Sequence, residues 1–539
     1  MTRPWTEIHL AKKAEQLERI PVEWRLTPDF LAKHADTIDL RPLVAESGIL
    51  SEQELAITVL DATALAEQVA AGVYSAVETV TAYCKRAAVA QQLANCLTEI
   101  MFRDAIEEAK KLDEIYKTTG KTVGALHGVP MTFKECFHVK GYDASDGYIT
   151  RTFDPSTYDS YLIELVRAAG AVVIAKTNTP QTMLVAEADN NVFGRTRNPV
   201  VSHLTCGGSS GGEGSAVAIG GSALGIGTDV GGSIRVPAAC NGIYGYKPTN
   251  GILPMQGFAA SNWKGMNTGV PAVAGPMARS ARDLTLLSRT VRSLQPWKGD
   301  PAVIPRIFEQ GITRPADKKP VIGVVYSSGL TPHPPVLRAI REAAEKLAAA
   351  GYEVKDFVPV DYAEIRAVTA ELFTIDGLSY PKRELEAAGE PVVPSVQSIG
   401  FWGRPAKTPE QMWELGAKKG AFQKEMLDRW QQAGIDLVLC PAGPHTAVKP
   451  SEWAFDHYTV AWNAMDYPAV IIPFTTADPE KDPRATDFKP LSADDERIQA
   501  QYEPELMAGA PVALQFVGSR MSDAQLLADV EVLDAILNN

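Results

Sequence analysis

Short apolar runs alternate with stretches of helical periodicity along most of this chain, and this alternation constrains the fold more than any other feature. Apolar side chains recur every three or four positions over 65–97 and 104–116, as in helices that bury one face. The apolar runs have the length of buried strands and lie at 128–133, 172–177, 223–228, 321–326, 437–440, 469–474 and 511–517. The pattern predicts an α/β fold: a single large domain whose mixed, twisted β-sheet is covered by α-helices on both faces.

The first sixty residues carry charged helical patterns broken by Pro21, Pro28 and Pro42. We expect residues 1–60 to form an N-terminal helical extension packed on the core, and residues 61–539 to form the main domain. Two segments are expected to be surface connections, because 295–319 is rich in proline and charge and 475–505 carries an excess of acids.

Composition excludes several classes of protein. The formal charge of −13 argues against a general nucleic-acid-binding surface. Six cysteines without a CxxC pair argue against a disulfide scaffold or a zinc ribbon. His203 and Cys206 alone do not make a metal site, so we expect neither a metal nor a cofactor. With no secretory signal and no apolar stretch long enough to span a membrane, a cytoplasmic protein is expected.

The block from Cys206 to Pro248 is rich in glycine and serine, and it holds the candidate chemistry. A flexible linker would not interleave its glycines with apolar residues, so this block is expected to be folded and buried. Within it, Gly231 and Gly232 precede Ser233 and can direct successive backbone N–H groups toward one point. That is the requirement for an oxyanion hole, with Ser233 as the nucleophile.

A rival motif lies in the same block. Residues 207–211 fit G-x-S-x-G, the nucleophile elbow of α/β-hydrolases, with Ser209 as the nucleophile. That fold needs a downstream histidine, and His333, His445 and His457 are available without a convincing sequence setting. Without a histidine base, a buried lysine is the physical alternative, because desolvation disfavours its ammonium form. Lys134, at the end of a largely apolar segment, is the best candidate, although a buried lysine is more often a paired structural cation.

Several motifs taken together resemble those of the amidase signature family of Ser-Ser-Lys hydrolases. They are G-V-P-M-T-F-K-E, G-G-S-S-G-G, G-T-D-V-G-G-S-I-R-V-P, Y-G-Y-K-P-T and G-A-P-V-A-L-Q-F-V-G, spread from about residue 126 to the C-terminus. Within the family, the long N-terminal extension is similar to that of fungal acetamidases and general amidases. The resemblance implies the amidase signature fold and makes 61–539 its catalytic domain.

The resemblance also implies a role for each matching residue. Ser233 would be the nucleophile, Ser209 a proton shuttle preceded by a cis peptide bond, and Lys134 the neutral base. The backbone N–H groups of Val230, Gly231, Gly232 and Ser233 would bind the oxyanion. Ser210 would hydrogen-bond the lysine, while Asp229 and Arg235 would brace the loop.

The activity implied is hydrolysis of small, acetamide-like carboxylic amides to acid and ammonia through an acyl-enzyme. Alternatives are a carbamate (urethane) hydrolase, a fatty-acid-amide-type hydrolase and an aminoacyl-tRNA amidotransferase subunit, the last disfavoured by the N-terminal extension. The implied partner is a small-molecule amide, and a homodimer is expected from relatives. The variable segments 255–267 and 380–402 are expected to form the substrate pocket, with Met183, Phe258, Trp263 and Trp402 as candidate lining residues.

Overall fold

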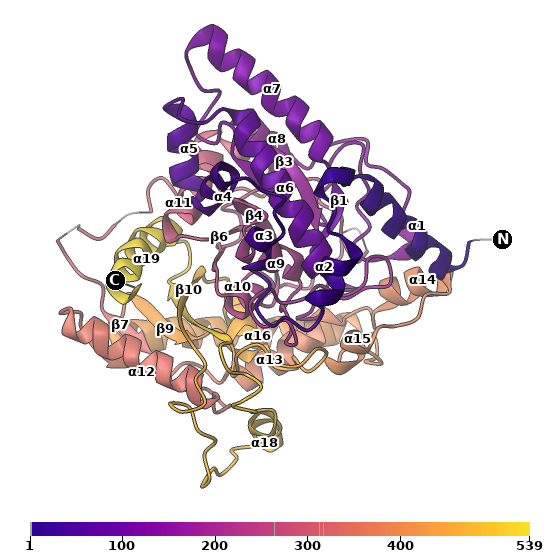
Figure 1. The fold of residues 1–539 in the computed structure, drawn as a ribbon. Helices are drawn as coiled ribbons and strands as arrows, with labels where there is room; N and C mark the ends of the chain where they lie inside the picture. The colour runs from indigo at the N-terminus through magenta and orange to yellow at the C-terminus, as the bar shows by residue number, and fades with distance from the viewer. Residues whose placement is uncertain (1–2, 264, 312, 316, 539) are drawn as a thin grey trace.

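A mixed β-sheet of eleven strands runs through the computed structural model, which describes residues 3–263, 265–311, 313–315 and 317–538 (Figure 1). The strands are β1 (Leu97–Ile100), β2 (Pro130–Lys134), β3 (Val172–Thr177), β4 (Leu224–Asp229), β5 (Tyr244–Lys247), β6 (Val273–Ala278), β7 (Ile322–Val324), β8 (Val354–Asp356), β9 (Leu437–Pro441), β10 (Ala469–Thr476) and β11 (Pro511–Gly518). Their order across the sheet is β1-β3-β2-β4-β6-β5-β10-β11-β9-β7-β8. β2 pairs in parallel with β3 and β4, and β7 with β8 and β9, whereas the remaining neighbours are antiparallel.

Helices cover both faces of this sheet, and the alternation of side chains along β10 shows it. Val470 and Ile472 belong to the large core cluster that includes residues of α11 and α19. Ile471, between them, packs instead with Ile234 and with Ala238 of α10. Because successive strand residues point to opposite faces, α10 lies on one face and α11 and α19 lie on the other. The predicted α/β architecture is confirmed.

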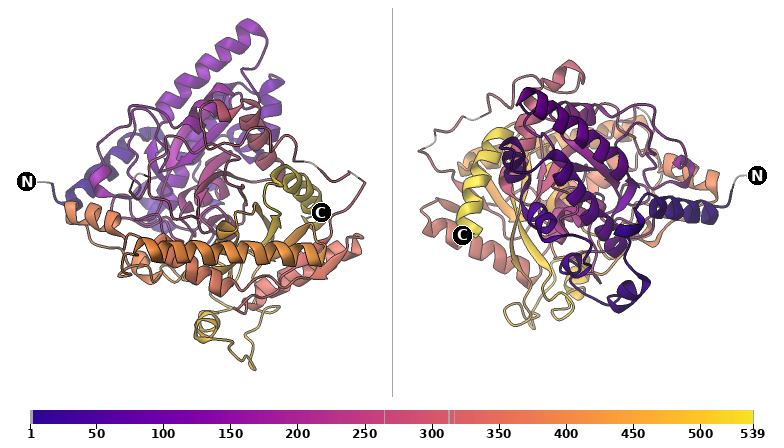
Figure 2. Two further views of the ribbon diagram at one scale, coloured as in Figure 1. Left: turned by 180° about the vertical axis from the view of Figure 1, so that it is seen from behind. Right: turned by 45° about the horizontal axis from the view of Figure 1, so that its top comes forward.

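The α-helices are α1 (Trp5–Glu18), α2 (Pro28–Lys33), α3 (Leu43–Glu46), α4 (Glu52–Val59), α5 (Ala62–Ala70), α6 (Ala76–Ala94), α7 (Phe102–Thr119), α8 (Tyr161–Ala168), α9 (Gly211–Ala218), α10 (Arg235–Asn241), α11 (Ala281–Ser293), α12 (Pro334–Ala349), α13 (Tyr362–Phe373), α14 (Ser379–Ala388), α15 (Pro394–Ser398), α16 (Pro409–Ala433), α17 (His457–Ala464), α18 (Ala493–Ala500) and α19 (Asp523–Asn538). Within the described ranges, short 3₁₀ turns accompany them at Val22–Trp24, Ile149–Arg151 and Pro296–Lys298. Figure 2 shows the long α16 along the outside of the molecule.

Several elements differ from the sequence-based expectation. The helix expected to continue to residue 97 ends at Ala94, and 97–100 form the edge strand β1. β5 and β6 were not predicted, because Gly245 and the Gly275-Pro276 pair make them look like loops. The segment 475–505, expected to be a solvated loop, contains α18.

The N-terminal residues are tied to the sheet by a buried charge. Lys12 of α1 is 1 % exposed, and its Nζ lies 2.6 Å from a carboxylate oxygen of Glu99 on β1 and 3.0 Å from one of Asp143. The same helix therefore contacts both the edge of the sheet and the loop that follows β2. In the ranges that the structure describes, no helix combines the length and the apolar character needed to cross a lipid bilayer.

Candidate active site

Lys134 is the last residue of β2, and the sheet determines what it meets. β2 and β4 are parallel neighbours, so their carboxyl ends reach the same edge of the sheet. The Nζ of Lys134 donates hydrogen bonds to the Oγ of Ser209 at 2.6 Å and to the Oγ1 of Thr228, on β4, at 2.8 Å. Two hydroxyl groups, and no carboxylate, are therefore its hydrogen-bond partners among the described residues.

Burial sets the charge of this lysine. Lys134 is fully buried, and desolvation lowers its pKa from 10.5 to about 8, against the opposing attraction of neighbouring groups that include Asp146 and Asp229. Lys176, which is equally buried, has a different environment, because its Nζ lies 3.4 Å from a carboxylate oxygen of Glu135. Lys176 thus fits the paired structural cation, whereas Lys134 has the surroundings of a base.

Ser209 lies in the turn between Cys206 and α9, and the peptide bond from Gly208 to Ser209 is cis. This matches the geometry that the family resemblance implied. Gly208 is required here because a Cβ at its position would lie 1.9 Å from the carbonyl oxygen of Glu187. Ser209 is 2 % exposed, so its hydroxyl faces the interior.

Ser210 was expected to hydrogen-bond Lys134, but the two side chains share no hydrogen bond in the described part of the chain. Its amide donates to the carbonyl oxygen of Ser233 at 3.1 Å. Its Oγ lies 3.2 Å from both the carbonyl oxygen and the amide nitrogen of Thr228. The hydroxyl of Thr228, rather than that of Ser210, is the second hydrogen-bond partner of Lys134. Ser210 instead links the loop that carries Ser209 to the loop that carries Ser233.

The loop that carries Ser233 is held by a buried ion pair. Asp229, at the end of β4, accepts hydrogen bonds from the amides of Gly232 at 2.8 Å and Ile234 at 3.1 Å. Arg235 donates to both carboxylate oxygens at 3.0 Å, and neither side chain has any exposed surface. Burial alone would raise the pKa of Asp229, but the charge and hydrogen bonds of Arg235 hold that pKa far below its usual range. The predicted bracing contact between Asp229 and Arg235 is therefore present.

The same loop presents backbone donors beside Ser233. The amide of Gly232 is occupied by Asp229. Within the described part of the chain, the amides of Val230, Gly231 and Ser233 donate to no other group. Gly232 has φ +132°, and a Cβ there would lie 2.4 Å from the Oγ1 of Thr459, so only glycine fits this turn.

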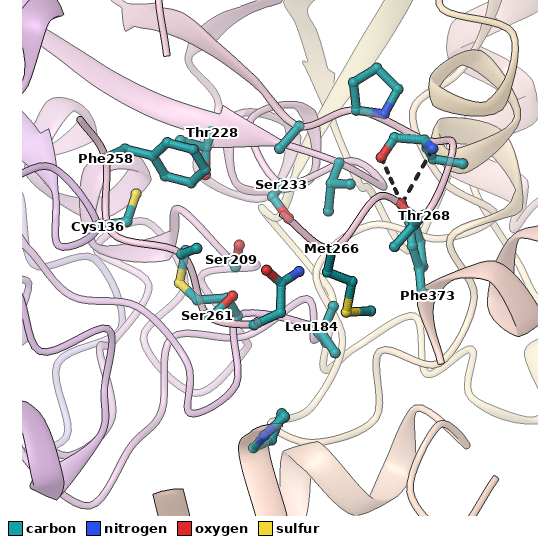
Figure 3. Close-up of a pocket in the computed structure, with 18 of the residues that line it drawn as sticks. Cys136, Leu184, Ser209, Thr228, Ser233, Phe258, Ser261, Met266, Thr268 and Phe373 are labelled. Atoms are coloured by element: carbon teal, nitrogen blue, oxygen red, sulfur yellow. Dashed lines mark hydrogen bonds between the residues drawn. The ribbon is translucent and has the colours of Figure 1, made fainter. Parts of the chain in front are cut away.

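A cavity of about 220 Å³ opens in front of both serines. Figure 3 shows the hydroxyls of Ser209 and Ser233 facing the same space, with Met266 and Leu184 across from them. The predicted pocket residues Met183 and Phe258 line the cavity. Trp263, the third candidate, is 38 % exposed and packs on Tyr380 instead.

The fourth candidate, Trp402, lies under the ammonium group of Lys382 and is not among the described lining residues. The predicted segment 380–402 contributes Pro381 to this cavity. The segment 255–267 contributes more, from Phe258 to Asn262 and again at Met266 and Asn267.

The histidines required by the rival hydrolase motif lie elsewhere. Burial lowers the pKa of His333 to about 3 and those of His445 and His457 to about 4. The rings of His333 and His445 lie 5.7 Å apart, and no histidine is among the described residues that line the cavity. In the part of the chain that the structure describes, no group of three or more His, Cys, Asp or Glu side chains is arranged to hold a metal ion.

Two polar residues near the site were not predicted from the sequence. Thr228 supplies the second hydroxyl group that Lys134 contacts. The sequence feature that could have indicated it is a polar residue at the end of the apolar run 223–228. Glu213 of α9 is fully buried and accepts hydrogen bonds from the hydroxyls of Thr132 at 2.6 Å and Thr177 at 2.9 Å. Burial raises the pKa of Glu213 to about 8, and the carboxyl joins α9 to strands β2 and β3.

Comparison with known proteins identifies the class. The family model described as Amidase matches residues 78–527. An acetamidase of Emericella nidulans is 37% identical over 551 residues, covering 100% of this chain and 99% of that protein. An acetamidase of Aspergillus oryzae is 36% identical, with 99% of each chain covered. The solved structure of a fatty acid amide hydrolase superposes with a TM-score of 0.92 at 30% identity, covering 99% of this chain and 95% of that one.

The fold and these relatives together define an α/β enzyme that hydrolyses amides. More particularly, the chain belongs to the amidase signature family, as the motifs of the sequence indicated.

Proposed function

We propose that this enzyme cleaves small, neutral carboxylic amides through Ser233, Ser209 and Lys134. The observation that carries the proposal is the 2.6 Å hydrogen bond between the buried, cavity-facing Ser209 and a lysine whose pKa is lowered to about 8. A serine hydroxyl needs a base to become nucleophilic, and a neutral amine can serve as that base.

The reaction then proceeds in two stages. The Oγ of Ser233 adds to the amide carbon while its proton passes to Ser209, and the proton of Ser209 passes to Lys134. When the C–N bond breaks, the proton returns through Ser209 to the departing nitrogen, which leaves as ammonia or an amine. Water then adds to the acyl-enzyme by the same proton path, releasing the acid and restoring Ser233.

The negative oxygen that forms in each stage requires hydrogen-bond donors. The amides of Val230, Gly231 and Ser233 have no acceptor in the described structure and serve this role. Gly232 was included in the predicted oxyanion hole, but its amide already binds Asp229. We assign it to holding the turn in shape.

The substrate is proposed by analogy with the relatives named acetamidase, so acetamide is the reference compound. Carbamates undergo the same acyl chemistry and remain the closest alternative. The fatty acid amide hydrolase structure favours amide chemistry of the same kind. An amidotransferase role is not favoured, because the named relatives with matched full length are amidases.

The test is covalent labelling combined with turnover. A fluorophosphonate probe is expected to label Ser233, and the variant Ser233→Ala should lose amide hydrolysis by about 10³-fold or more while retaining its thermal unfolding temperature. Labelling at Ser209 in the wild type would contradict the assignment and favour the hydrolase-elbow interpretation. The variant Gln397→Ala changes an exposed residue of α15 that is not among the described lining residues of the cavity, and it serves as the control for handling and folding.

A further inference from the structure

Two cavities of very different size meet at Ser233. The larger, of about 220 Å³, is the one described above, and the smaller measures about 30 Å³. Both are bounded by Met183, Leu184, Val230, Ser233 and Phe373, so a molecule bound at Ser233 can extend into either of them.

Apart from the residues they share, the two cavities are lined by different parts of the site. The larger is lined by the hydroxyl-bearing residues Ser209 and Thr228, the two partners of Lys134 (Figure 3). The smaller is lined by Gly208 and by the turn from Val230 to Ser233 that carries the free amides. Apolar residues including Ile399 and Phe401 close it, together with Asp456, whose carboxylate is paired with Arg366 at 2.9 Å.

The chemistry of the proposed function orients a substrate between them. The departing nitrogen must receive its proton from Ser209, so the amine half lies on the side of Ser209, which is the larger cavity. The carbonyl oxygen points to the free amides of the turn from Val230 to Ser233. The acyl group, bonded to the carbonyl carbon opposite the amine, is directed away from Ser209 and extends past these amides into the smaller cavity. This step rests on the proposed roles of Ser233 and Ser209.

Size then discriminates between substrates. At about 30 Å³ for each water-sized group, the smaller cavity holds about one such group and the larger holds roughly seven. The methyl of an acetyl group fits the smaller cavity, whereas ammonia would use little of the larger one. We propose that the enzyme acts on N-substituted amides that combine a short acyl group with a bulky, largely apolar amine.

The structure keeps the larger cavity open with fixed contacts. Trp263 donates from Nε1 to the Oγ of Ser379 at 2.9 Å, and its ring packs edge-on against Tyr380. Arg151 donates to the carbonyl oxygen of Ala260 at 2.8 Å. These contacts hold the segment 258–263 against α14 and maintain the space in which the amine would sit.

An isomeric pair of amides tests the orientation directly. N-benzylacetamide has a small acyl group and a bulky amine, whereas N-methyl-2-phenylacetamide has the same atoms with the two halves exchanged. We expect kcat/KM for N-benzylacetamide to exceed that for its isomer by about tenfold or more, because only the former places its ring in the larger cavity. Release of benzylamine and of methylamine is measured in the same assay. Equal rates, or a faster isomer, would overturn the proposal.

Two substitutions test the assignment of each cavity. Ser261→Phe fills the larger cavity and should lower the ratio of kcat/KM for N-benzylacetamide to that for acetamide by about tenfold. Ile399→Ala enlarges the smaller cavity and should raise the ratio for butyramide over acetamide by several-fold. The control Gln397→Phe places a phenyl group at an exposed site and should change neither ratio. The proposal is wrong if Ser261→Phe leaves its ratio unchanged.

These experiments separate the two levels of the argument. If no amide is hydrolysed and Ser233 is not labelled, the proposed function itself fails. If acetamide is hydrolysed through Ser233 but the bulky half is preferred as the acyl group, only the orientation fails.

Discussion

The charge state of Lys134 has a measurable consequence for the pH dependence of the reaction. Burial lowers its pKa from 10.5 to about 8, which corresponds to about 3 kcal/mol in favour of the neutral amine. At pH 7 about 9 % of the molecules would hold a neutral lysine, compared with about 0.03 % for an exposed lysine. Burial thus increases the active fraction by about 300-fold.

The sign follows from the proposed role of Lys134 as a base. Protonation removes the base, so kcat/KM should fall about tenfold for each pH unit below about 8 and should level off above it. The measurement is ammonia release from acetamide between pH 5 and 10. Lys134→Met should lower kcat/KM by about 10²–10⁴-fold and should abolish this acidic limb.

Lys247 provides a matched control. It is also buried, its pKa is also lowered to about 8 by desolvation, and its Nζ donates to the carbonyl oxygen of Pro248 at 3.0 Å rather than to Ser209 or Ser233. Lys247→Met should keep the acidic limb. The assignment of Lys134 as the base is refuted if Lys134→Met retains the acidic limb of the pH profile, or if single replacement of His333, His445 or His457 removes that limb.

The remaining predictions concern metal dependence, the ion pair that holds the Ser233 loop, and the packing of the N-terminal helix α1. Chelation by EDTA should leave amide hydrolysis unchanged; activity that is lost and then restored by a divalent ion would contradict this. Arg235→Met should lower the free energy of unfolding by about 3–5 kcal/mol, because it leaves the carboxylate of Asp229 buried without its partner; chemical denaturation measures it, and a change below 1 kcal/mol would show that the pair is dispensable. Lys12→Met should destabilise the enzyme more than Lys13→Met on the same helix, because Lys12 contacts two buried carboxylates whereas Lys13 donates to the uncharged amide oxygen of Asn95. Equal melting temperatures of the two variants would contradict this.

The local hydrophobic pattern was enough to predict those strands whose apolar runs are not interrupted by glycine. β3 coincides with its predicted range, and β9, β10 and β11 differ from theirs by one or two residues, because each is a continuous apolar run. β5 and β6 are strands because neighbours pair with them on both sides, a property of the whole sheet that their glycines and proline conceal.

In the candidate site, too, some features could be predicted from local sequence and others depend on the folded structure. Motifs and apolar context were enough to single out Lys134, Ser209 and Ser233, whose roles stay predictions. The hydroxyl of Thr228 beside Lys134 depends on the parallel pairing of β2 and β4, which no local pattern encodes. The engagement of the Gly232 amide by Asp229 likewise depends on the folded turn.

The brace behind Ser233 also joins residues about half a chain length apart. Arg235 donates to the side-chain oxygen of Gln515 on β11 at 2.8 Å, across a separation of 280 residues. A ribosome that has delivered Ser233 must therefore still synthesise more than half of the protein before this guanidinium meets its last acceptor. We expect chains that end before Gln515 to be inert toward amides.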